Sequence, residues 1–371
     1  MRSLLLAAVA ACALTLSVAP SAAAQTSPAP AAASAASRLH LPPAKAGRAR
    51  PLVVVVADNR GAETTDFVIP YGVLKDSGVA EVRSLSTVEG PVQLLRALRI
   101  EADQTLAQFD ATDPAGADIV IVPAQAHPND PVLVAWIQDQ AARGAVIIPV
   151  CEGARVLART GLLDARRATT HWSALKDLER AYPETTWVRD LRYVQDGPII
   201  STTGVTASIP MSLALVEAIG GHAVAARTAE RLGMADWDPR HRTADYSLGR
   251  ADVLRAVGSL LAFWTHEEIE LPIEDGADEI ALALRSDAWS RSYRARVVST
   301  ADDLGPVTAA HGLVILPDGT HDGGHYVIPA DSGPAADQLD RAIDAMGARY
   351  GAAARRFAVN GLEYVAPSER R

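Results

Sequence analysis

The stretch VIIPVCEGARVLARTGLLDARRATTHW, residues 146–172, decides the fold and raises the question of function. An apolar run ends just before Cys151, and the residues EGARVLART then have the pattern of a helix that stops at Gly161. This order predicts a buried strand, a sharp turn that carries a thiol, and a helix, which is the arrangement of the nucleophile elbow in hydrolases. The N–H groups at the start of such a helix favour a thiolate and can hold a developing oxyanion, while Gly153 allows close backbone packing in the turn. A buried, unreactive cysteine at the end of a strand is the alternative.

Apolar runs of the same kind occur along the first part of the chain. They do not alternate with polar residues, which is typical of strands buried on both faces. The runs are LVVVVA at 52–57, DIVIVP at 118–123, AVIIPV at 145–150 and, more weakly, GPIIST at 197–202. Helical patterns lie between them, at 66–78, 130–144 and 208–221. Buried strands that alternate with helices predict a flavodoxin-like α/β fold, in which helices sandwich a parallel sheet and the working residues lie at the carboxyl ends of the strands.

The N-terminal residues have the composition of segments that lie outside a fold. Residues 1–24 combine a charged start, an apolar stretch and a small-residue end, which predicts a signal peptide and a periplasmic or secreted protein; a lipobox at Cys12 is the alternative. With Cys12 removed, Cys151 would have no disulfide partner in its own chain. Residues 25–50 are rich in Ala, Pro and Ser, which predicts a disordered linker.

Length, hydropathy and charge narrow the classes of partner. The 371 residues are 49% hydrophobic, which is enough for two domains or one large one. Apart from the N-terminal stretch, no run approaches the length of a membrane span. The formal net charge is −9 and no basic stripe stands out. We therefore expect a small-molecule ligand or substrate rather than a nucleic acid or a membrane.

Three separate stretches together resemble the ThiJ/PfpI superfamily (the DJ-one group), whose fold is like that of class I glutamine amidotransferases. They are GAETTDFVIPYGVLKDSG at 61–78, VCEGA at 150–154 and GLLDARRATTHW at 161–172. The likeness covers residues 51–235, which we expect to form one domain. Within the superfamily, the chain is most similar to isonitrile hydratases and to the sensory domains of AraC-type regulators.

The resemblance implies roles for three residues. Cys151 matches the nucleophile, and Asp66, four residues before Pro70, matches an acidic residue that lies against the sulfur and is usually protonated. A carboxyl group beside a thiolate in a cramped pocket resists ionisation. His171 follows Cys151 by twenty residues, a spacing that the superfamily shares, and would be either catalytic or a pocket or interface residue.

Two departures from the superfamily pattern concern the oxyanion hole and the reaction. Ala124 and Gln125 stand where relatives often have a Gly-Gly pair that supplies an N–H group. Gln125 or His127 could donate instead. Pro149 stands where amidotransferases have a glycine two residues before the cysteine, which argues against transfer of a glutamine amide.

Four further residues are candidates for lining the pocket. Glu152, next to the thiol, is either a pocket group or a solvated carboxylate favoured by the helix dipole. The loop STTGVTASIP at 201–210 follows a predicted strand and resembles a pocket-edge segment. This resemblance makes Thr203, Gly204 and Thr206 candidates as well.

The C-terminal part looks like a faint, incomplete copy of the first domain. Residues 276–318 match residues 61–103 at a constant offset of 215 residues. Asp66 corresponds to Ala281 and no cysteine follows, so the copy lacks the candidate chemistry. We expect residues 250–371 to form a degenerate α/β half-copy that covers the pocket or replaces the partner of a homodimer.

These features leave two interpretations of function open. In the first, an exported enzyme uses Cys151 as a nucleophile for hydration or hydrolysis of a small electrophile, of the isonitrile or 2-oxoaldehyde class. In the second, a non-catalytic module binds a ligand or senses redox state through the same thiol. We expect no cofactor, and the two histidines of HDGGH at 321–325 lie in a glycine-rich loop that does not indicate a metal site.

Overall fold

The computed structural model describes residues 38–95, 97–247, 249, 266–321 and 323–364. The predicted signal peptide and the first part of the predicted linker lie outside the described residues. The linker prediction is wrong for residues 38–50, which contact the first domain. Arg48 and the backbone N–H of Lys45 both bind the buried carboxylate of Asp118, each at 2.8 Å. Burial of that carboxylate requires hydrogen-bond donors, and this segment supplies them.

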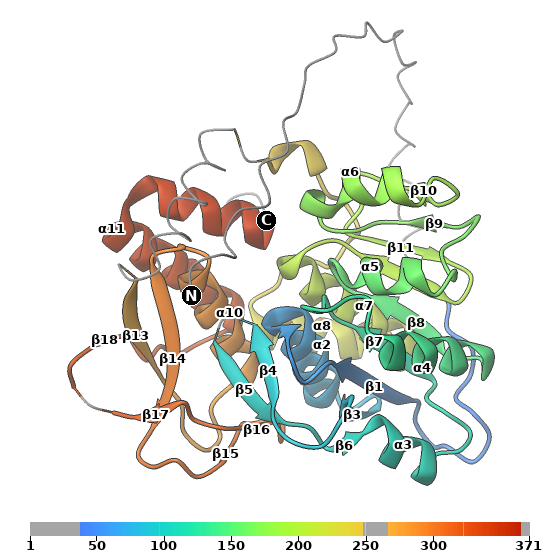
Figure 1. The fold of residues 1–371 in the computed structure, drawn as a ribbon, viewed down its shortest axis with the longest axis horizontal. Helices are drawn as coiled ribbons and strands as arrows, with labels where there is room; N and C mark the ends of the chain where they lie inside the picture. Colours follow the sequence, from blue (N-terminus) through green and yellow to red (C-terminus); the bar gives the residue numbers. More distant parts are fainter. Residues whose placement is uncertain (1–37, 96, 248, 250–265, 322, 365–371) are drawn as a thin grey trace, which may run out of the picture. The chain divides into compact units, whose positions relative to one another are not determined.

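A seven-stranded sheet forms the centre of the first domain, in the order β11-β12-β8-β7-β1-β3-β6 (Figure 1). Every neighbouring pair is parallel except β11 and β12, which are antiparallel. The strands are β1 (Leu52–Ala57), β3 (Glu81–Ser86), β6 (Gln104–Thr105), β7 (Ile119–Val122), β8 (Val146–Pro149), β11 (Tyr193–Asp196) and β12 (Ile199–Thr202). All four predicted strands are therefore present, and they are neighbours in one sheet.

Helices cover both faces of this sheet. They are α2 (Thr64–Ser77), α3 (Leu106–Thr112), α4 (Pro131–Ala142), α5 (Gly153–Arg159), α6 (Trp172–Ala181), α7 (Ser208–Gly220) and α8 (His222–Leu232), with short 3-10 helices η1 (Val205–Ala207) and η2 (Thr243–Asp245). Val53 and Val55 of β1 pack in one apolar cluster with α2 and α7, whereas Val54 and Val56 pack in another with α4, α5 and α6. Alternate side chains of one strand point to opposite faces. The predicted flavodoxin-like α/β sandwich is confirmed.

The C-terminal region is a second α/β unit with a smaller sheet. Its sheet is parallel, in the order β17-β14-β13-β18. The strands are β13 (Glu267–Pro272), β14 (Ala295–Ala301), β17 (Gly319–Thr320) and β18 (Tyr326–Val327), and the helices are α10 (Glu279–Ser290) and α11 (Ala335–Leu362). The backbone of α11 is broken at Gly351, where φ is 87° and ψ is 174°. Described residues of this region and of the first domain belong to one compact unit.

A mixed sheet joins the two regions. Its order is β15-β16-β5-β4-β2. The strands are β2 (Ala62–Glu63), β4 (Val92–Leu95), β5 (Leu98–Glu101), β15 (Val307–Thr308) and β16 (Val314–Ile315), while β9 (Arg167–Ala168) and β10 (Thr186–Trp187) form a separate pair. In the antiparallel pair of β5 and β16, Ile100 lies opposite Ile315, the residue that corresponds to it at the offset of 215. Figure 1 shows β16 beside β5.

Local hydrogen bonds also recur at that offset. Ser84 Oγ donates to Asp103 Oδ2 at 2.8 Å, and Ser299 Oγ donates to Asp318 Oδ2 at 3.1 Å. In both pairs the aspartate backbone N–H donates back to the serine hydroxyl. Helix α10 begins at Glu279, 215 residues after the start of α2 at Thr64.

Among the described residues, no helix is both long and apolar enough to cross a membrane.

Candidate functional site

Cys151 stands between β8 and α5, in the strand–turn–helix arrangement that the sequence predicts. Its φ is 57°, in the left-handed region that costs a residue with a side chain about 1–3 kcal/mol. The Cys151 N–H donates to the carbonyls of Thr202 and Thr203, each at 3.1 Å, which fixes the turn against the end of β12. A Cβ atom on Gly153 would lie 2.1 Å from the carbonyl oxygen of Val122, so only glycine fits there.

Asp66 lies in the first turn of α2 and is fully buried. Its Oδ2 accepts a hydrogen bond from the Ala124 N–H at 3.3 Å, while Oδ1 has no partner among the described residues. Burial, followed by the nearby charge of Glu63, raises the pKa of Asp66 well above its usual range. This shift favours the protonated carboxyl group, the form that the resemblance implies.

Glu63 is a site residue that the sequence reasoning missed. Its side chain accepts from the Asp66 N–H at 2.7 Å and caps α2. Its other oxygen accepts from Arg291 at 2.9 Å, and the same guanidinium donates to Asp287 at 2.8 Å. Burial and the charge of Asp287 raise the pKa of Glu63 to about 7, although Arg291 opposes the shift. Glu63 is recognisable in the sequence only as a cap residue before α2, whereas Arg291 comes from the C-terminal region.

The surroundings of Cys151 oppose ionisation of its thiol, whereas the sequence predicts a thiolate favoured by the helix N-terminus. Cys151 is 6% exposed. Burial raises the pKa of the thiol well above its usual value, and the carboxyl groups of Asp66, Glu152, Glu63 and Glu363 raise it further. Burial therefore favours the protonated form of both the thiol and Asp66.

Alkylation of Cys151 by iodoacetamide is expected to accelerate without a plateau up to pH 10. The reactive thiolate is a minor form below a raised pKa, so the rate should increase about tenfold per pH unit. Rates are followed by mass spectrometry of the tryptic peptide that carries Cys151. An unstructured peptide with an ordinary thiol is the control and should level off near pH 9. A plateau below pH 8 for Cys151 would show that the site holds a thiolate after all.

His171 is buried at the N-cap of α6 and belongs to a polar chain that includes Glu152. The His171 Nδ1 lies 2.6 Å from the Ser173 hydroxyl, which donates to Glu152 at 2.9 Å. Glu152 also pairs with Arg155 at 2.6 Å. Burial lowers the pKa of His171, so its ring is neutral at neutral pH. The Ser173 hydroxyl therefore links the Glu152 carboxylate to the His171 ring.

The loop after β12 contributes the predicted residues Thr203, Gly204 and Thr206, and it meets the second missed residue, Glu363. The Gly204 N–H donates to the Glu363 carboxylate at 2.9 Å, and the Thr206 hydroxyl donates to the Glu363 carbonyl at 2.7 Å. The Thr203 hydroxyl is buried and has no partner among the described residues. Glu363 is 1% exposed and follows α11 at the far end of the chain. No local signal in the sequence places it here.

The side chain of Gln125 is engaged in the loop around Asp58. It accepts from the Asp58 N–H at 2.9 Å and donates to the Pro123 carbonyl at 3.0 Å. His127 is half exposed, and its Nδ1 lies 3.9 Å from Asp58 Oδ2. A role of either residue as the oxyanion donor stays a prediction.

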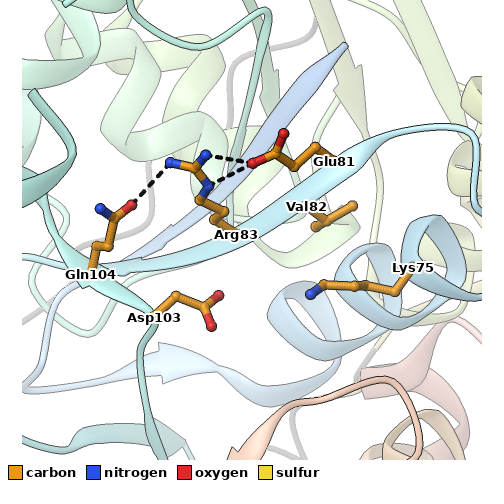
Figure 2. Close-up of a pocket in the computed structure, with 6 residues that line it drawn as sticks. All are labelled: Lys75, Glu81, Val82, Arg83, Asp103 and Gln104. Carbon is orange, nitrogen blue, oxygen red and sulfur yellow. Dashed lines mark hydrogen bonds and ion pairs between the residues drawn. The ribbon is translucent and has the colours of Figure 1, made fainter. Parts of the chain in front are cut away.

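A surface hollow elsewhere is separate from this site. It has a volume of about 410 Å³ and is lined by Lys75, Glu81, Val82, Arg83, Asp103 and Gln104, which Figure 2 shows. Most of these residues belong to β3 and β6, at the opposite edge of the sheet from β12. Arg83 is already paired with Glu81 and Asp113. The described part of the chain holds no cluster of three or more His, Cys, Asp and Glu residues suited to a metal.

Comparisons with known proteins define the class. The model of the DJ-1/PfpI family matches residues 52–218. A Parkinson disease protein 7 homolog of Danio rerio is 30% identical over 192 residues, which are 50% of this chain and 98% of that protein. The isonitrile hydratase of Pseudomonas putida is 31% identical over 160 residues, 42% of this chain and 67% of that enzyme. The chain belongs to the DJ-1/PfpI family.

The chain is also similar to part of a transcriptional regulator. The HTH-type transcriptional regulator CdhR of Pseudomonas aeruginosa is 31% identical over 159 residues. These are 42% of this chain but 46% of the regulator, so the chain spans less than half of that relative. Among solved structures, a mutant DJ-1 superfamily protein of Salmonella typhimurium has 27% identity, with a TM-score of 0.43. That match covers 48% of this chain and 96% of the solved chain.

Proposed function

We propose that the chain is a cysteine-dependent hydratase or hydrolase that acts on a small electrophile of the isonitrile or 2-oxoaldehyde class. The left-handed backbone of Cys151 carries this proposal. Such strain persists where the surrounding structure enforces it, and it is concentrated at active sites. A buried site with a protonated thiol and a protonated carboxyl group suits a neutral reacting group, because no charge has to be desolvated beside the sulfur. The likeness to an isonitrile hydratase supports the same class.

The protonated thiol of Cys151 and the protonated carboxyl group of Asp66 can together hydrate an isonitrile. The Cys151 sulfur forms a bond to the terminal carbon of the isonitrile, while the Asp66 carboxyl gives that carbon a proton and regains one from the thiol. The product of this step is a thioimidate on the sulfur. Water then adds to the same carbon, the S–C bond breaks, and sulfur and nitrogen each end with one proton. The released product is an N-substituted formamide.

Replacing Cys151 by serine is expected to reduce turnover of a panel of small isonitriles and methylglyoxal at least a hundredfold. Serine lacks the intrinsic nucleophilicity of sulfur and has no base beside it at neutral pH. Product formation is measured by chromatography with wild-type protein and with a Cys12→Ser variant, which should match it. Equal turnover by the Cys151→Ser protein would exclude Cys151 as the nucleophile. If wild-type protein turns over no member of the panel, the hydratase proposal is rejected for these classes.

Ligand binding or redox sensing without turnover is the second candidate. The raised pKa of a thiol that is almost fully buried favours ligand binding without turnover rather than redox sensing, because the thiolate is the form that peroxide oxidises. The relationship to a transcriptional regulator supports it as well. In this case an isonitrile or oxoaldehyde would bind, or peroxide would oxidise Cys151, and no product would leave the protein.

We also propose that residues 250–371 are a degenerate repeat that replaces the partner of a homodimer. The pairing of Ile100 with Ile315 supports it, since equivalent residues face each other across a two-fold axis in a symmetric dimer. Residues 1–24 are proposed to direct export to the periplasm or beyond, on the basis of their composition alone.

A further inference from the structure

Four nitrogen atoms converge on the carboxylate of Glu363. The Trp172 N–H, at the first residue of α6, donates to Oε1 at 3.0 Å, and the Gly204 N–H donates to Oε2 at 2.9 Å. The Nε2 atoms of His171 and His241 lie 3.9 Å and 3.4 Å from the same group. We call these four groups the carboxylate cradle. Three of them belong to the first domain and His241 follows that domain, whereas Glu363 comes from the C-terminal region.

Glu363 fills the cradle imperfectly. Both histidine residues are more than nine-tenths buried, yet neither Nε2 atom makes a hydrogen bond of good geometry within the described part of the structure, although the backbone of Gly361 lies near His171. Leaving such buried polar atoms without partners is costly. Glu363 also has a left-handed backbone, with φ at 47°. Its carboxylate binds two of the four nitrogen atoms and leaves the two Nε2 atoms 3.9 Å and 3.4 Å away.

The cradle adjoins the thiol. The Thr203 carbonyl accepts from the Cys151 N–H at 3.1 Å, and the next residue, Gly204, binds Glu363. A Cβ atom on Gly204 would lie 2.3 Å from His171 Cδ2 and 3.0 Å from Glu363 Cδ, so glycine is required for this close approach. A molecule anchored in the cradle would therefore extend toward the sulfur.

We propose that the carboxylate cradle is a binding subsite of the Cys151 site, that Glu363 occupies it as an internal ligand, and that the external ligand is a small molecule whose carboxylate competes with Glu363. This inference depends on the proposed function in one respect, namely that the ligand reacts at Cys151. The experiments below measure binding and alkylation rather than turnover, so their outcome does not depend on whether the protein is a hydratase.

Replacing Glu363 by alanine should let free acetate fill the cradle. The substitution removes the CH2 and carboxylate groups, which are close in size and charge to acetate. We expect acetate to raise the Tm of Glu363→Ala saturably, by about 3 °C or more, because a ligand that binds only the folded state stabilises it. Acetamide, which has the same shape without the charge, should have no saturable effect, and acetate should leave wild-type protein unchanged. If acetate stabilises the folded variant no more than acetamide does, the proposal is wrong.

Alkylation of Cys151 gives a second measurement that does not depend on the alanine variant. Iodoacetate carries a carboxylate and iodoacetamide does not, so the ratio of their rates at Cys151 reports access for carboxylates. We expect Glu363→Gln to raise this ratio at least tenfold over wild type. The glutamine amide presents an NH2 group to the N–H donors of the cradle, so it binds there more weakly than a carboxylate and competes less with iodoacetate. Glu152→Gln is the matched control, because it also removes a negative charge near Cys151 but reaches the cradle only indirectly, through Ser173. An unchanged ratio in Glu363→Gln, or an equal rise in the control, would overturn the proposal.

Discussion

Replacing Arg291 by alanine is expected to lower the free energy of unfolding by about 3–5 kcal/mol, because it leaves two buried carboxyl groups without their cation. Arg291 donates to Glu63 and to Asp287, and the Asp287 side chain is fully buried. Solvent cannot replace the guanidinium at this position. The loss would also show that the C-terminal region stabilises the first domain. Arg291 comes from the C-terminal region, whereas Glu63 caps α2, the helix that carries Asp66.

Urea denaturation at pH 8, monitored by circular dichroism, measures this loss. Arg296→Ala is the matched control, because Arg296 pairs with Glu268 on the surface and its side chain is 71% exposed. Exposed pairs contribute about 0–1 kcal/mol, so the control should unfold almost as wild type does. Equal stability of the two variants would mean that the buried ion pairs contribute no more than the exposed one.

The destabilisation should be larger at pH 8 than at pH 5. The pKa of Glu63 is about 7 in the folded protein, above its ordinary value, so the ionised form is disfavoured by folding. Ionisation of Glu63 therefore lowers the free energy of unfolding. This effect begins near the pKa of Glu63 in the unfolded chain and increases until the pH exceeds its pKa in the folded protein. Loss of Arg291 raises the folded pKa further and extends this growth to higher pH. At pH 5, Glu63 is protonated in the folded state of both proteins, so its ionisation in the unfolded chain lowers the stability of both equally and wild type and variant should differ less.

The parts of this fold that could be predicted are those with a local cause. The apolar run at 52–57 does not alternate with polar residues, because helices cover both faces of β1. This pattern can be recognised from the sequence alone. The turn at Cys151 was predictable as well, because a strand, a thiol and a close-packed glycine follow one another in the sequence. Asp66 was accessible only through the family resemblance, because nothing local shows that a residue in a first helical turn is fully buried.

The parts that could not be predicted depend on tertiary contacts. Arg291 meets Glu63 across 228 positions of the chain, and Glu363 meets Gly204 across 159. The helix N-terminus at Cys151 is a local feature, whereas the burial that raises the pKa of its thiol depends on tertiary packing. Gln125 lies close in sequence to the missing glycine pair, but its side chain binds the backbone of Asp58, from the adjacent strand end.

Replacing Gly153 by alanine is expected to destabilise the protein by about 3 kcal/mol or more and to displace the thiol. The new Cβ atom would lie 2.1 Å from the Val122 carbonyl oxygen and 3.1 Å from that of Pro123, both of which are backbone atoms. A flexible side chain could move aside, but these carbonyls belong to the end of β7, in the centre of the sheet. The turn must shift instead, and with it the position of Cys151 relative to Asp66.

The measurement is thermal unfolding together with the alkylation rate of Cys151 at fixed pH. Gly319→Ala is the control, because Gly319 has an ordinary backbone conformation and no atom within 4 Å of the new Cβ position. If Gly153→Ala unfolds at the control temperature and Cys151 keeps its wild-type alkylation rate, the close packing of the turn is not needed to hold the sulfur. If the variant is folded but its thiol reacts faster, the packing of the elbow is what keeps the sulfur buried, because a shifted turn exposes it and lowers the cost of its ionisation.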